Sequence, residues 1–342
     1  MSAATATAEL IEDRGESAAG AEFFRSRAFL DAEGVTHTLR IEGEGVELVA
    51  PLVVREIEGT DFRDAVSPYG YPGLVGDGRS RGHVRRSNSG EAPADTPPTP
   101  PVLDPRSVDF SGTGLASAFL RHRLGSPPLS GSSERNIVQI ADPALPPKSR
   151  PSDRRQVRKN LEAGYELVLV PGAETTPAQR AAFVEVYEQT MRRTAAAPHY
   201  FFGGAYFDRV LEAEGTWLAL ATAPDGKVAA ASLATVSDGF LHYYLSGSGD
   251  SHLRDSPMKN VVARLVEHSA ELGLPLNLGG GLSSGDALEE FKRGFANRQE
   301  PWHSSEIVCD AEEYRRLSAD REVGSFFPAY RAPTGGRPGS DR

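Results

Sequence analysis

Apolar residues in the second half of the chain recur with clear periods that predict helices and strands. Phe183, Val186 and Tyr187 share one face at helical spacing. Ahead of them, Thr176–Gln179 supplies an N-cap threonine, a proline at the first helical position and a capping-box glutamine. We therefore expect a helix that starts there and reaches about Arg193.

Turn signals predict the other elements of this half. Gly164 is suited to close a helix as a left-handed cap, and Asp238-Gly239 is a strong hairpin turn. The expected order is a helix, a strand, two helices, three strands, a helix, a strand and a last helix. These elements are expected over residues 152–163, 165–170, 176–193, 204–214, 216–223, 228–237, 240–245, 256–272, 275–278 and 286–295.

The first half has a less regular pattern and ends in a cluster of prolines between residues 143 and 151, which marks a domain junction. We expect one domain over residues 21–147 and a second over residues 148–324. The elements expected in the first domain are helices near 21–33 and 114–124 and strands at 36–42, 46–57 and 136–140.

Three stretches have a composition that does not favour a packed fold. Residues 1–20 are rich in alanine, threonine and glutamate, and residues 325–342 end in a Gly/Pro/Arg tail. Residues 76–106 are rich in proline, glycine, serine and arginine and offer few apolar groups to offset the entropy of ordering. We expect disordered termini and a long mobile loop inside the first domain.

Composition and charge narrow the class of protein. The chain has 342 residues, of which 39% are hydrophobic, and a formal net charge of −10, which argues against a protein that coats nucleic acid. No apolar run approaches the roughly 18 residues of a membrane span, so a cytoplasmic location is expected. The single Cys309 excludes an intramolecular disulfide framework and a cysteine-cluster zinc site. His199, His242 and His303 lack metal-ligand spacing, so no metal is expected.

The order of predicted elements resembles the GCN5-related N-acetyltransferase (GNAT) fold, and several motifs resemble its Fem-type (FemABX-like) aminoacyl transferase branch and the related "acetyltransferase 6" proteins. The motifs are Ser67–Gly73, Arg154–Leu161 with Ala163-Gly164, Tyr187–Arg193, Tyr200–Phe202, Leu278–Gly281 and Phe291–Phe295. The resemblance implies an α/β protein with tandem GNAT-like domains, the first degenerate, and a mixed central sheet flanked by helices.

The resemblance also implies a reaction. A Fem-type enzyme forms an amide bond by moving an aminoacyl group from the acceptor end of aminoacyl-tRNA to an amine of a small molecule, a peptide or a cell-wall precursor, with no cofactor beyond the donor. A different donor gives the alternative activity, acyl-CoA-dependent N-acetyl transfer. A third alternative is a catalytically inactive relative that serves as a binding module.

The same resemblance assigns roles to particular residues. Phe291 and Lys292 line the donor end, where Lys292 helps to stabilise the oxyanion. Tyr200 and the glycines Gly279, Gly280 and Gly281 belong to the donor cleft. Tyr69 and Tyr71 form either an acceptor wall or ordinary packing, and Lys292 can instead be a lysine that snorkels from a packed helix.

A dense basic run is visible in the residues themselves. Arg154, Arg155, Arg158 and Lys159 lie one turn apart on the predicted helix and share a face, and only Asp153 opposes them nearby. Such a cluster can hold phosphates of tRNA or of a nucleotide-linked acceptor. The alternative is a solvated linker helix.

One stretch departs from the pattern of enzymes that use CoA. Those enzymes hold the pyrophosphate with backbone N–H groups at a helix N-terminus. Here the equivalent residues 246–257 contain two aspartates, Asp250 and Asp255, and Pro257 provides no N–H. The loop is therefore predicted to be a poor pyrophosphate site, and it can equally be a plain surface loop that caps a helix.

Overall fold

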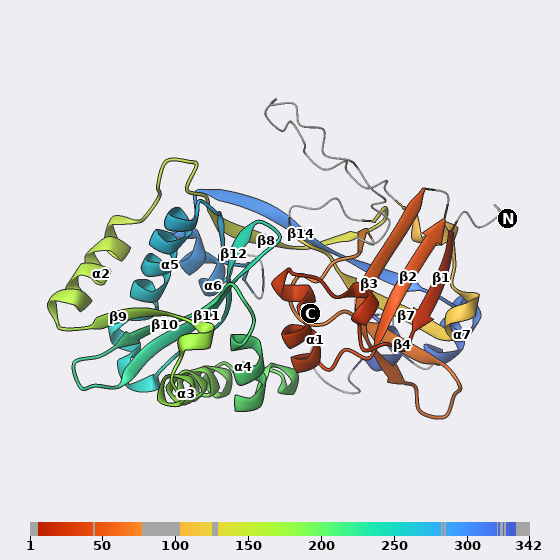
Figure 1. Ribbon diagram of the computed structural model, residues 1–342, viewed down its shortest axis with the longest axis horizontal. Coiled ribbons are helices and arrows are strands. Elements are labelled where there is room, and N and C mark those ends of the chain that lie inside the picture. The colour runs from red at the N-terminus through yellow and green to blue at the C-terminus, as the bar shows by residue number, and fades with distance from the viewer. Residues whose placement is uncertain are drawn as a thin grey trace, which may run out of the picture. The chain divides into compact units, whose positions relative to one another are not determined.

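The computed structural model describes residues 6–43, 45–76, 103–124, 129–281, 283, 285–319, 321, 324 and 326–332. It separates into two compact units (Figure 1). The first unit holds the described residues of Met1–Ala19, Gly34–Ser133 and His303–Thr334, and the second holds those of Gly20–Glu33 and Glu134–Trp302. Most of the loop expected at 76–106 lies outside the described residues, although Leu103 is buried in the core of the first unit.

The first unit is built on a mixed sheet. Its strands follow the order β6-β1-β2-β3-β4-β7-β14, and β5 pairs with β3. The strands are β1 Ala6–Ile11, β2 His37–Gly43, β3 Val46–Glu56, β4 Arg63–Val66, β5 Val75–Gly76, β6 Val108–Asp109, β7 Leu115–Arg121 and β14 Arg298–Val308. The neighbours β1, β2, β3 and β4 pair antiparallel, whereas β4 and β7 are parallel. The helix α7, Ala311–Leu317, follows β14.

Two predictions for this unit were wrong. Residues 6–11, expected to be disordered, form β1, because Ala6 and Ala8 alternate with polar residues and bury their small side chains in the sheet. Residues 115–121, expected to be helical, form β7. Most of β7 is buried without a period of two, as in a strand covered on both faces, and a short run of this kind cannot be distinguished from a buried helix by its pattern.

The units exchange segments, so their limits differ from the contiguous domains expected at 21–147 and 148–324. Residues 20–33, expected to open the first domain, belong to the second unit as the 3-10 turn Phe23–Arg25 and the helix α1 Arg27–Ala32. Residues 303–334 return to the first unit. There Tyr330, in a tail expected to be disordered, is buried with its hydroxyl 2.8 Å from that of Ser117.

From α2 onward the second unit has the predicted order of elements, and it also contains β8, which was expected in the first domain. They are β8 Ser133–Ala141, α2 Pro151–Glu162, β9 Glu166–Pro171, α3 Pro177–Arg193, α4 Gly204–Leu211, β10 Thr216–Thr222, β11 Val228–Ser237, β12 Phe240–Ser248, α5 Met258–Leu272, β13 Leu276–Asn277 and α6 Ala287–Arg293. The capping box at Thr176 is formed, and Gly164 takes a positive φ directly after α2. The strand order is β14-β8-β13-β12-β11-β10-β9.

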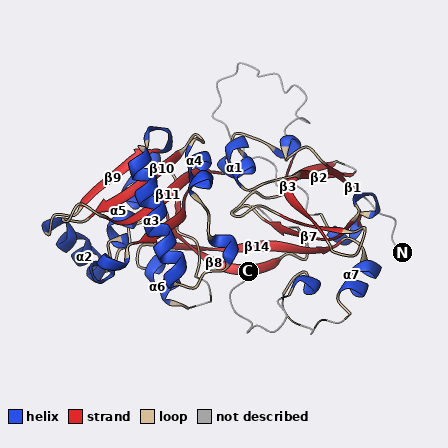
Figure 2. Ribbon diagram, turned by 90° about the horizontal axis from the view of Figure 1, so that it is seen from below, coloured by secondary structure: helices blue, strands red, loops and turns tan. Residues whose placement is uncertain are grey.

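Helices cover this sheet on both sides (Figures 1 and 2). On one face, α5 packs its apolar stripe, which includes Val262 and Leu265, against the sheet residues Ala230 and Leu241. The helices α3 and α4 pack together against the opposite face. Gly247 allows β12 to touch α3, because a Cβ there would collide with the backbone of Tyr187.

The sheet opens between β12 and β13. These parallel strands pair only at Leu241 with Leu276 and at His242 with Asn277, whereas β12 continues along β11 to Ser248. The register between β11 and β12 also shifts by one residue at Tyr244, which marks a bulge. The opening and the bulge occur together, two residues beyond the last β12–β13 pair.

The exchanged segment 20–33 is fixed to the second unit by a buried aromatic cluster. Phe24 is fully buried, with its ring centroid 5.0 Å from that of His242 and 5.4 Å from those of Phe29 and Tyr244. An ion pair between Arg25 and Asp238, 2.7 Å long and mostly buried, ties the segment to the β11–β12 turn.

We predict that Phe24→Ala destabilises the protein by about 3–5 kcal/mol, because it removes a large buried side chain and leaves a cavity. Urea unfolding followed by circular dichroism would measure the loss. Leu145→Ala is the control: Leu145 is 41% exposed, and its truncation should change the free energy of unfolding by about 0.5 kcal/mol or less. Equal effects of the two variants would show that the segment is not part of the core.

Candidate functional site

Lys292 is a buried lysine in the last turn of α6. Only 8% of the residue is exposed, and its Nζ donates a 2.6 Å hydrogen bond to the carbonyl of Gly280. Burial lowers the pKa of Lys292 to about 8, and the negative charge of Asp286 partly opposes this shift. The ammonium is thus charged at neutral pH but poorly solvated, which is the state in which it interacts most strongly with a nearby negative charge.

The glycine turn 279–281 gives this ammonium its place. Gly279 has φ +74°, in the left-handed region, and a Cβ at this residue would lie 3.1 Å from Nζ of Lys292. Leu278 donates its N–H to the carbonyl of Gln139, and Gln139 donates its own N–H to the carbonyl of Gly279. Two residues therefore oppose one residue of β8, and this local bulge turns the chain toward α6.

The other two glycines allow side chains to approach the backbone. A Cβ at Gly280 would collide with the amide of Asn136, and one at Gly281 would collide with the carboxylate of Asp286. Asn136 donates a 2.7 Å hydrogen bond to the carbonyl of Gly281. A larger residue at Gly280 or Gly281 would therefore displace the side chain of Asn136 or Asp286, whereas at Gly279 the positive φ itself favours glycine.

Asp286 joins the turn to the helix. It is the N-cap of α6 and accepts hydrogen bonds from the N–H of Glu289 at 2.7 Å and of Ser283 at 3.0 Å. A hydrogen bond from the N–H of Gly285 is the main cause that lowers the pKa of Glu289, and the Arg293 ion pair adds to it. These carboxylates therefore accept specific backbone hydrogen bonds at the start of α6, where they also complement the helix dipole.

Asn277 also fixes the turn, and the sequence did not reveal its role. Its Oδ1 accepts the N–H of Gly279 at 2.8 Å, and its Nδ2 lies 3.1 Å from Nδ1 of His242. Burial lowers the pKa of His242 to about 4, so the ring is neutral. Its Nε2 lies 3.1 Å from the carbonyl of Ser237, which requires the proton on Nε2 and leaves Nδ1 to accept from Asn277.

Several N–H groups of the loop between β12 and α5 are already engaged in hydrogen bonds within the second unit. Hydrogen bonds to acceptors within the second unit are donated by the N–H groups of Gly249, Asp250, His252 and Ser256. The N-cap of α5 is Pro257, which has no N–H, and Ser256 before it has φ +49°. The structure therefore agrees with the departure seen in the sequence.

The helix α2 contacts this loop and the first turn of α5. The carbonyl of Asp255 accepts hydrogen bonds from Gln156 at 3.0 Å and from Asn160 at 2.8 Å. Asn160 is buried and also donates to Asn260 in the first turn of α5 at 2.7 Å. Asp153, also buried, pairs with Lys259 at 2.9 Å. Polar side chains of α2 thus satisfy groups at the start of α5.

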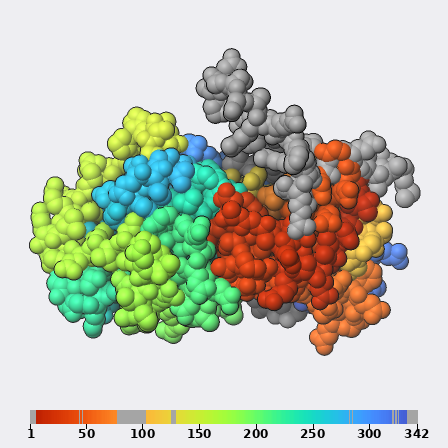
Figure 3. Space-filling model, viewed as in Figure 1, coloured from red at the N-terminus to blue at the C-terminus, as the bar shows by residue number. Residues whose placement is uncertain are grey.

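The opposite face of α2 is basic and exposed. The predicted cluster lies together on this face and consists of Arg154, Arg155, Arg158 and Lys159. Arg158 is 3.7 Å from Glu162, but both side chains are 70% exposed, so this contact is weak. Figure 3 shows the surface of this unit, where α2 lies beside α5.

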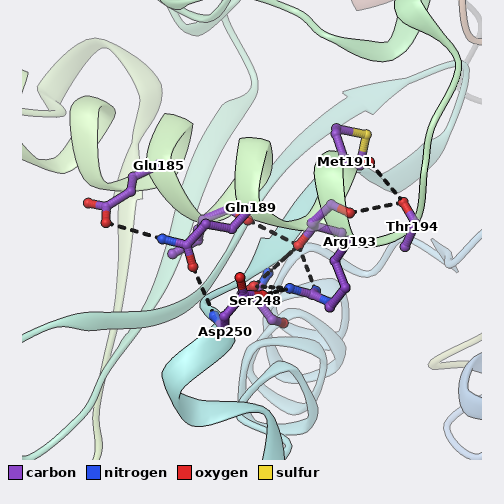
Figure 4. Close-up of polar contacts among 9 residues, drawn as sticks. Glu185, Gln189, Met191, Arg193, Thr194, Ser248 and Asp250 are labelled. Atoms are coloured by element: carbon purple, nitrogen blue, oxygen red, sulfur yellow. Dashed lines mark hydrogen bonds and ion pairs between the residues drawn. The ribbon is translucent and has the colours of Figure 1, made fainter.

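A surface hollow of about 470 Å³ lies where α3 ends beside β12, and its lining residues are Gln189, Arg192, Arg193, Asp250 and Leu253. Figure 4 shows that Arg193 reaches the carbonyl of Ser248 and the carboxylate of Asp250. Arg192 pairs with Glu188. Both cations of the hollow are thus already neutralised by carboxylates.

The remaining predicted site residues lie elsewhere. Phe291 packs on Phe295 at a centroid distance of 5.8 Å, so it serves the core beside Lys292. Tyr200 is half-buried, and its carbonyl accepts a 2.6 Å hydrogen bond from the hydroxyl of Tyr187. Tyr69 and Tyr71 are half-buried residues of the first unit, where the guanidinium of Arg121 lies 5.2 Å from the ring centre of Tyr69.

Comparisons with known proteins bear on the family and the fold. Residues 147–293 match a family model described as an acetyltransferase (GNAT) domain. Most of the second unit therefore matches an acetyltransferase (GNAT) domain. No curated protein matches the sequence.

Two solved structures have a similar fold. A crystal structure of FemX has a TM-score of 0.53 at 10% identity, covering 82% of this chain and 89% of that one. The C-terminal domain (DUF2156) of a putative lysylphosphatidylglycerol synthetase from Agrobacterium fabrum has a TM-score of 0.51 at 13% identity, covering 86% and 89%. At such identities the likeness concerns the fold alone. It extends over both units and confirms the predicted α/β class.

Among the described residues, no helix has the length and apolar character that a membrane span requires. In the same part of the chain, no three histidine, cysteine, aspartate or glutamate residues come together as ligands for a metal ion.

The lowered pKa of Lys292 predicts how its removal changes stability with pH. Folding lowers this pKa from 10.5 to about 8, so between these values the unfolded chain binds more protons than the native one. The wild type should therefore gain stability relative to Lys292→Met as pH rises from about 8 to 10.5. Urea unfolding of both proteins at several pH values tests this. A difference that stays constant across this window would show that Lys292 is not desolvated.

Proposed function

We propose that this protein transfers an aminoacyl group from aminoacyl-tRNA to an amine of a small molecule, a peptide or a cell-wall precursor. The observation that carries the proposal is that the two faces of α2 differ in what they contact. The inner face bonds the groups at the start of α5 where CoA enzymes bind a pyrophosphate, and the outer face presents Arg154, Arg155, Arg158 and Lys159 to solvent. The hydrogen bonds of the inner face count against an acyl-CoA donor, and the basic outer face suits a polyanionic donor.

The chemistry asks little of the protein beyond alignment and charge stabilisation. The ester of an aminoacyl-tRNA is already activated, and an α-amino acceptor with a pKa of about 8 is partly neutral at pH 7. The attack creates an oxyanion on the carbonyl oxygen. We assign its stabilisation to Lys292, because a buried ammonium interacts more strongly with the oxyanion than with the neutral ester.

The other roles follow from the same resemblance. The donor end would lie along the turn 279–281, with Tyr200 contributing to the donor cleft. Tyr69 and Tyr71 of the first unit would contact the acceptor, and the cation–π contact of Arg121 holds the Tyr69 ring in place. The family resemblance, including the fold of FemX, supports this division of roles.

Acyl-CoA-dependent N-acetyl transfer is the second candidate, and the matched family, described as an acetyltransferase domain, is the observation that favours it. The donor can be identified directly. Purified protein is offered radiolabelled acetyl-CoA or tRNA charged with radiolabelled amino acids, each with a mixed pool of amines. Transfer from charged tRNA that RNase abolishes supports the proposal, and transfer from acetyl-CoA alone overturns it in favour of the second candidate.

We predict that Lys292→Met lowers kcat by about 10²–10³-fold and changes KM much less, because the lost interaction forms in the transition state. Methionine keeps the aliphatic stem, and Lys292→Arg keeps the charge with altered reach, so it should restore activity only in part. Steady-state kinetics with the active donor measures both variants. A kcat within about threefold of wild type would assign Lys292 to packing. A raised donor KM alone would assign it to donor binding.

Reversing the charge on the basic face should weaken donor binding. We predict that Arg155→Glu with Arg158→Glu raises the donor KM steeply while the free energy of unfolding barely changes, since exposed charges contribute little to folding. The loss should be larger at low salt. Arg315→Glu with Arg316→Glu on α7 makes the same charge change in the first unit and serves as the control. Equal KM values for the two double variants would exclude a role for α2.

A further inference from the structure

The turn 279–281 carries backbone N–H groups that the fold does not use. The N–H of Gly279 donates to Oδ1 of Asn277 at 2.8 Å. In the part of the chain that the structure describes, the next two N–H groups, those of Gly280 and Gly281, donate to no acceptor. All three glycines are half-buried, so these donors are not sealed inside the core. Because backbone N–H groups without a protein partner bond water or a ligand, the turn is a place where an acceptor can bind.

The direction of the Gly280 N–H follows from the peptide that contains it. The carbonyl of Gly279, in the same peptide, accepts the N–H of Gln139 on β8 at 3.0 Å and therefore points toward β8. This peptide is trans, so its N–H points the opposite way. Since β13 lies between β8 and β12, the Gly280 N–H points toward the side of β12. The last pair of β12 with β13 is His242 with Asn277, so the N–H is directed into the opening of the sheet.

The ammonium of Lys292 lies close to this N–H. Its Nζ is 2.6 Å from the carbonyl oxygen of Gly280 and 3.1 Å from the Cβ position of Gly279. Three bonds join the nitrogen of a residue to its own carbonyl oxygen, so the nitrogen of Gly280 lies within about 6 Å of Nζ. The ammonium has three protons, and its bond to Gly280 uses one of them. Two donors at this separation can both bond one oxygen placed about 3 Å from each.

The second unused N–H, that of Gly281, has a different direction. It belongs to the peptide whose carbonyl, that of Gly280, points at Nζ, so this N–H points away from the ammonium. The turn itself is held in place, because Asn136 donates a 2.7 Å hydrogen bond to the carbonyl of Gly281. The Gly280 N–H is therefore a fixed donor, and a fixed donor costs no reorganisation when charge develops in front of it.

We propose that the backbone N–H of Gly280 is a second donor to the oxyanion, beside the ammonium of Lys292. The amine attacks the acyl carbon, forms the C–N bond and moves an electron pair of the carbonyl onto its oxygen. That oxygen accepts hydrogen bonds from Gly280 and Lys292. When the carbonyl re-forms, the bond to the leaving oxygen or sulfur breaks. The proton that the attacking nitrogen loses to solvent balances the proton that the leaving group takes up.

This assignment rests on the proposed function, because it needs an acyl transfer, but it does not depend on which donor is used. It requires the acyl carbonyl to enter the opening between β12 and β13 with its oxygen toward the turn. The plain alternative is an N–H that only binds water. Such an N–H would interact equally with the ground state and the transition state and would not affect kcat.

The test removes this N–H and nothing else from the residue. Translation of the full chain in vitro with glycolic acid in place of Gly280 replaces the amide by an ester, which has no N–H. With the donor that the wild type accepts, kcat should fall by about 10²-fold and KM should change much less, as for other oxyanion donors. The melting temperature should stay within a few degrees of the wild type, which shows that the variant folds.

A binding measurement separates the transition state from the ground state. A phosphonate analogue of the donor carries a negatively charged oxygen where the oxyanion forms, and an amide analogue keeps a neutral carbonyl. The ester at position 280 should weaken binding of the phosphonate by about the factor lost in kcat, because both report the same interaction. Binding of the amide analogue should change by less than about threefold.

Two further esters serve as controls. The ester at position 280 also weakens the carbonyl of Gly279, which accepts from Gln139. The α-hydroxy analogue of Gln139 removes the donor of that bond and leaves the Gly280 N–H intact, so it should cost much less than the ester at position 280. Glycolic acid in place of Gly226 removes an N–H that bonds the carbonyl of Ala223 at 2.9 Å in the β10–β11 turn. This control should keep kcat within about threefold of wild type.

The outcomes are distinct. A wild type that transfers from neither charged tRNA nor acetyl-CoA overturns the proposed function, and this assignment with it. An active wild type whose ester at Gly280 keeps its kcat and its affinity for the phosphonate overturns the assignment alone. Equal losses in the Gln139 control, or equal weakening of both analogues, also overturn it, because they would show that the turn is distorted and that no transition-state contact is lost.

Discussion

The arrangement of the second unit depends on a buried ammonium that the protein must satisfy. Lys292 is removed from water, and Gly280 supplies its hydrogen-bond acceptor. Presenting that carbonyl requires a left-handed residue at Gly279, and Asn277 holds that residue through its N–H. His242 in turn fixes Asn277. The free-energy cost of burying this charge is thus offset by the hydrogen bond to Gly280, whose carbonyl is held in place by hydrogen bonds among neutral groups.

Local patterns predicted the second unit well because its elements are amphipathic and have clear caps. The family resemblance assigned Lys292 and the three glycines to the donor end, and these residues do lie together. It could not reveal Asn277, because an asparagine before a glycine turn has the same appearance in a sequence whether or not its side chain holds the turn. Nor could it relate Glu33 to Tyr206, which lie 173 positions apart.

The wrong predictions have a common physical origin. In β7 and β1 the buried residues are mostly small, so neither shows the bulky alternation by which strands are recognised. The exchange of segments between the units could not be predicted from the sequence for a related reason. Proline clusters and composition mark where the chain is punctuated, but they carry no information about which core a segment enters. Phe23, Phe24 and Phe29 would complete either core as judged by composition alone.

The exchange of segments has a consequence for the order in which the chain folds during synthesis. The first unit needs residues 303–334 and the second needs residues 20–33, so neither can be completed from a contiguous stretch of chain. Nascent chains that lack the last segment would carry an unfinished first unit, with the place of Tyr330 unfilled. Contacts between such distant positions also slow folding. Ribosome-bound intermediates of this protein are therefore expected to expose apolar surface until residues 303–334 have been translated, and to depend on chaperones during that interval.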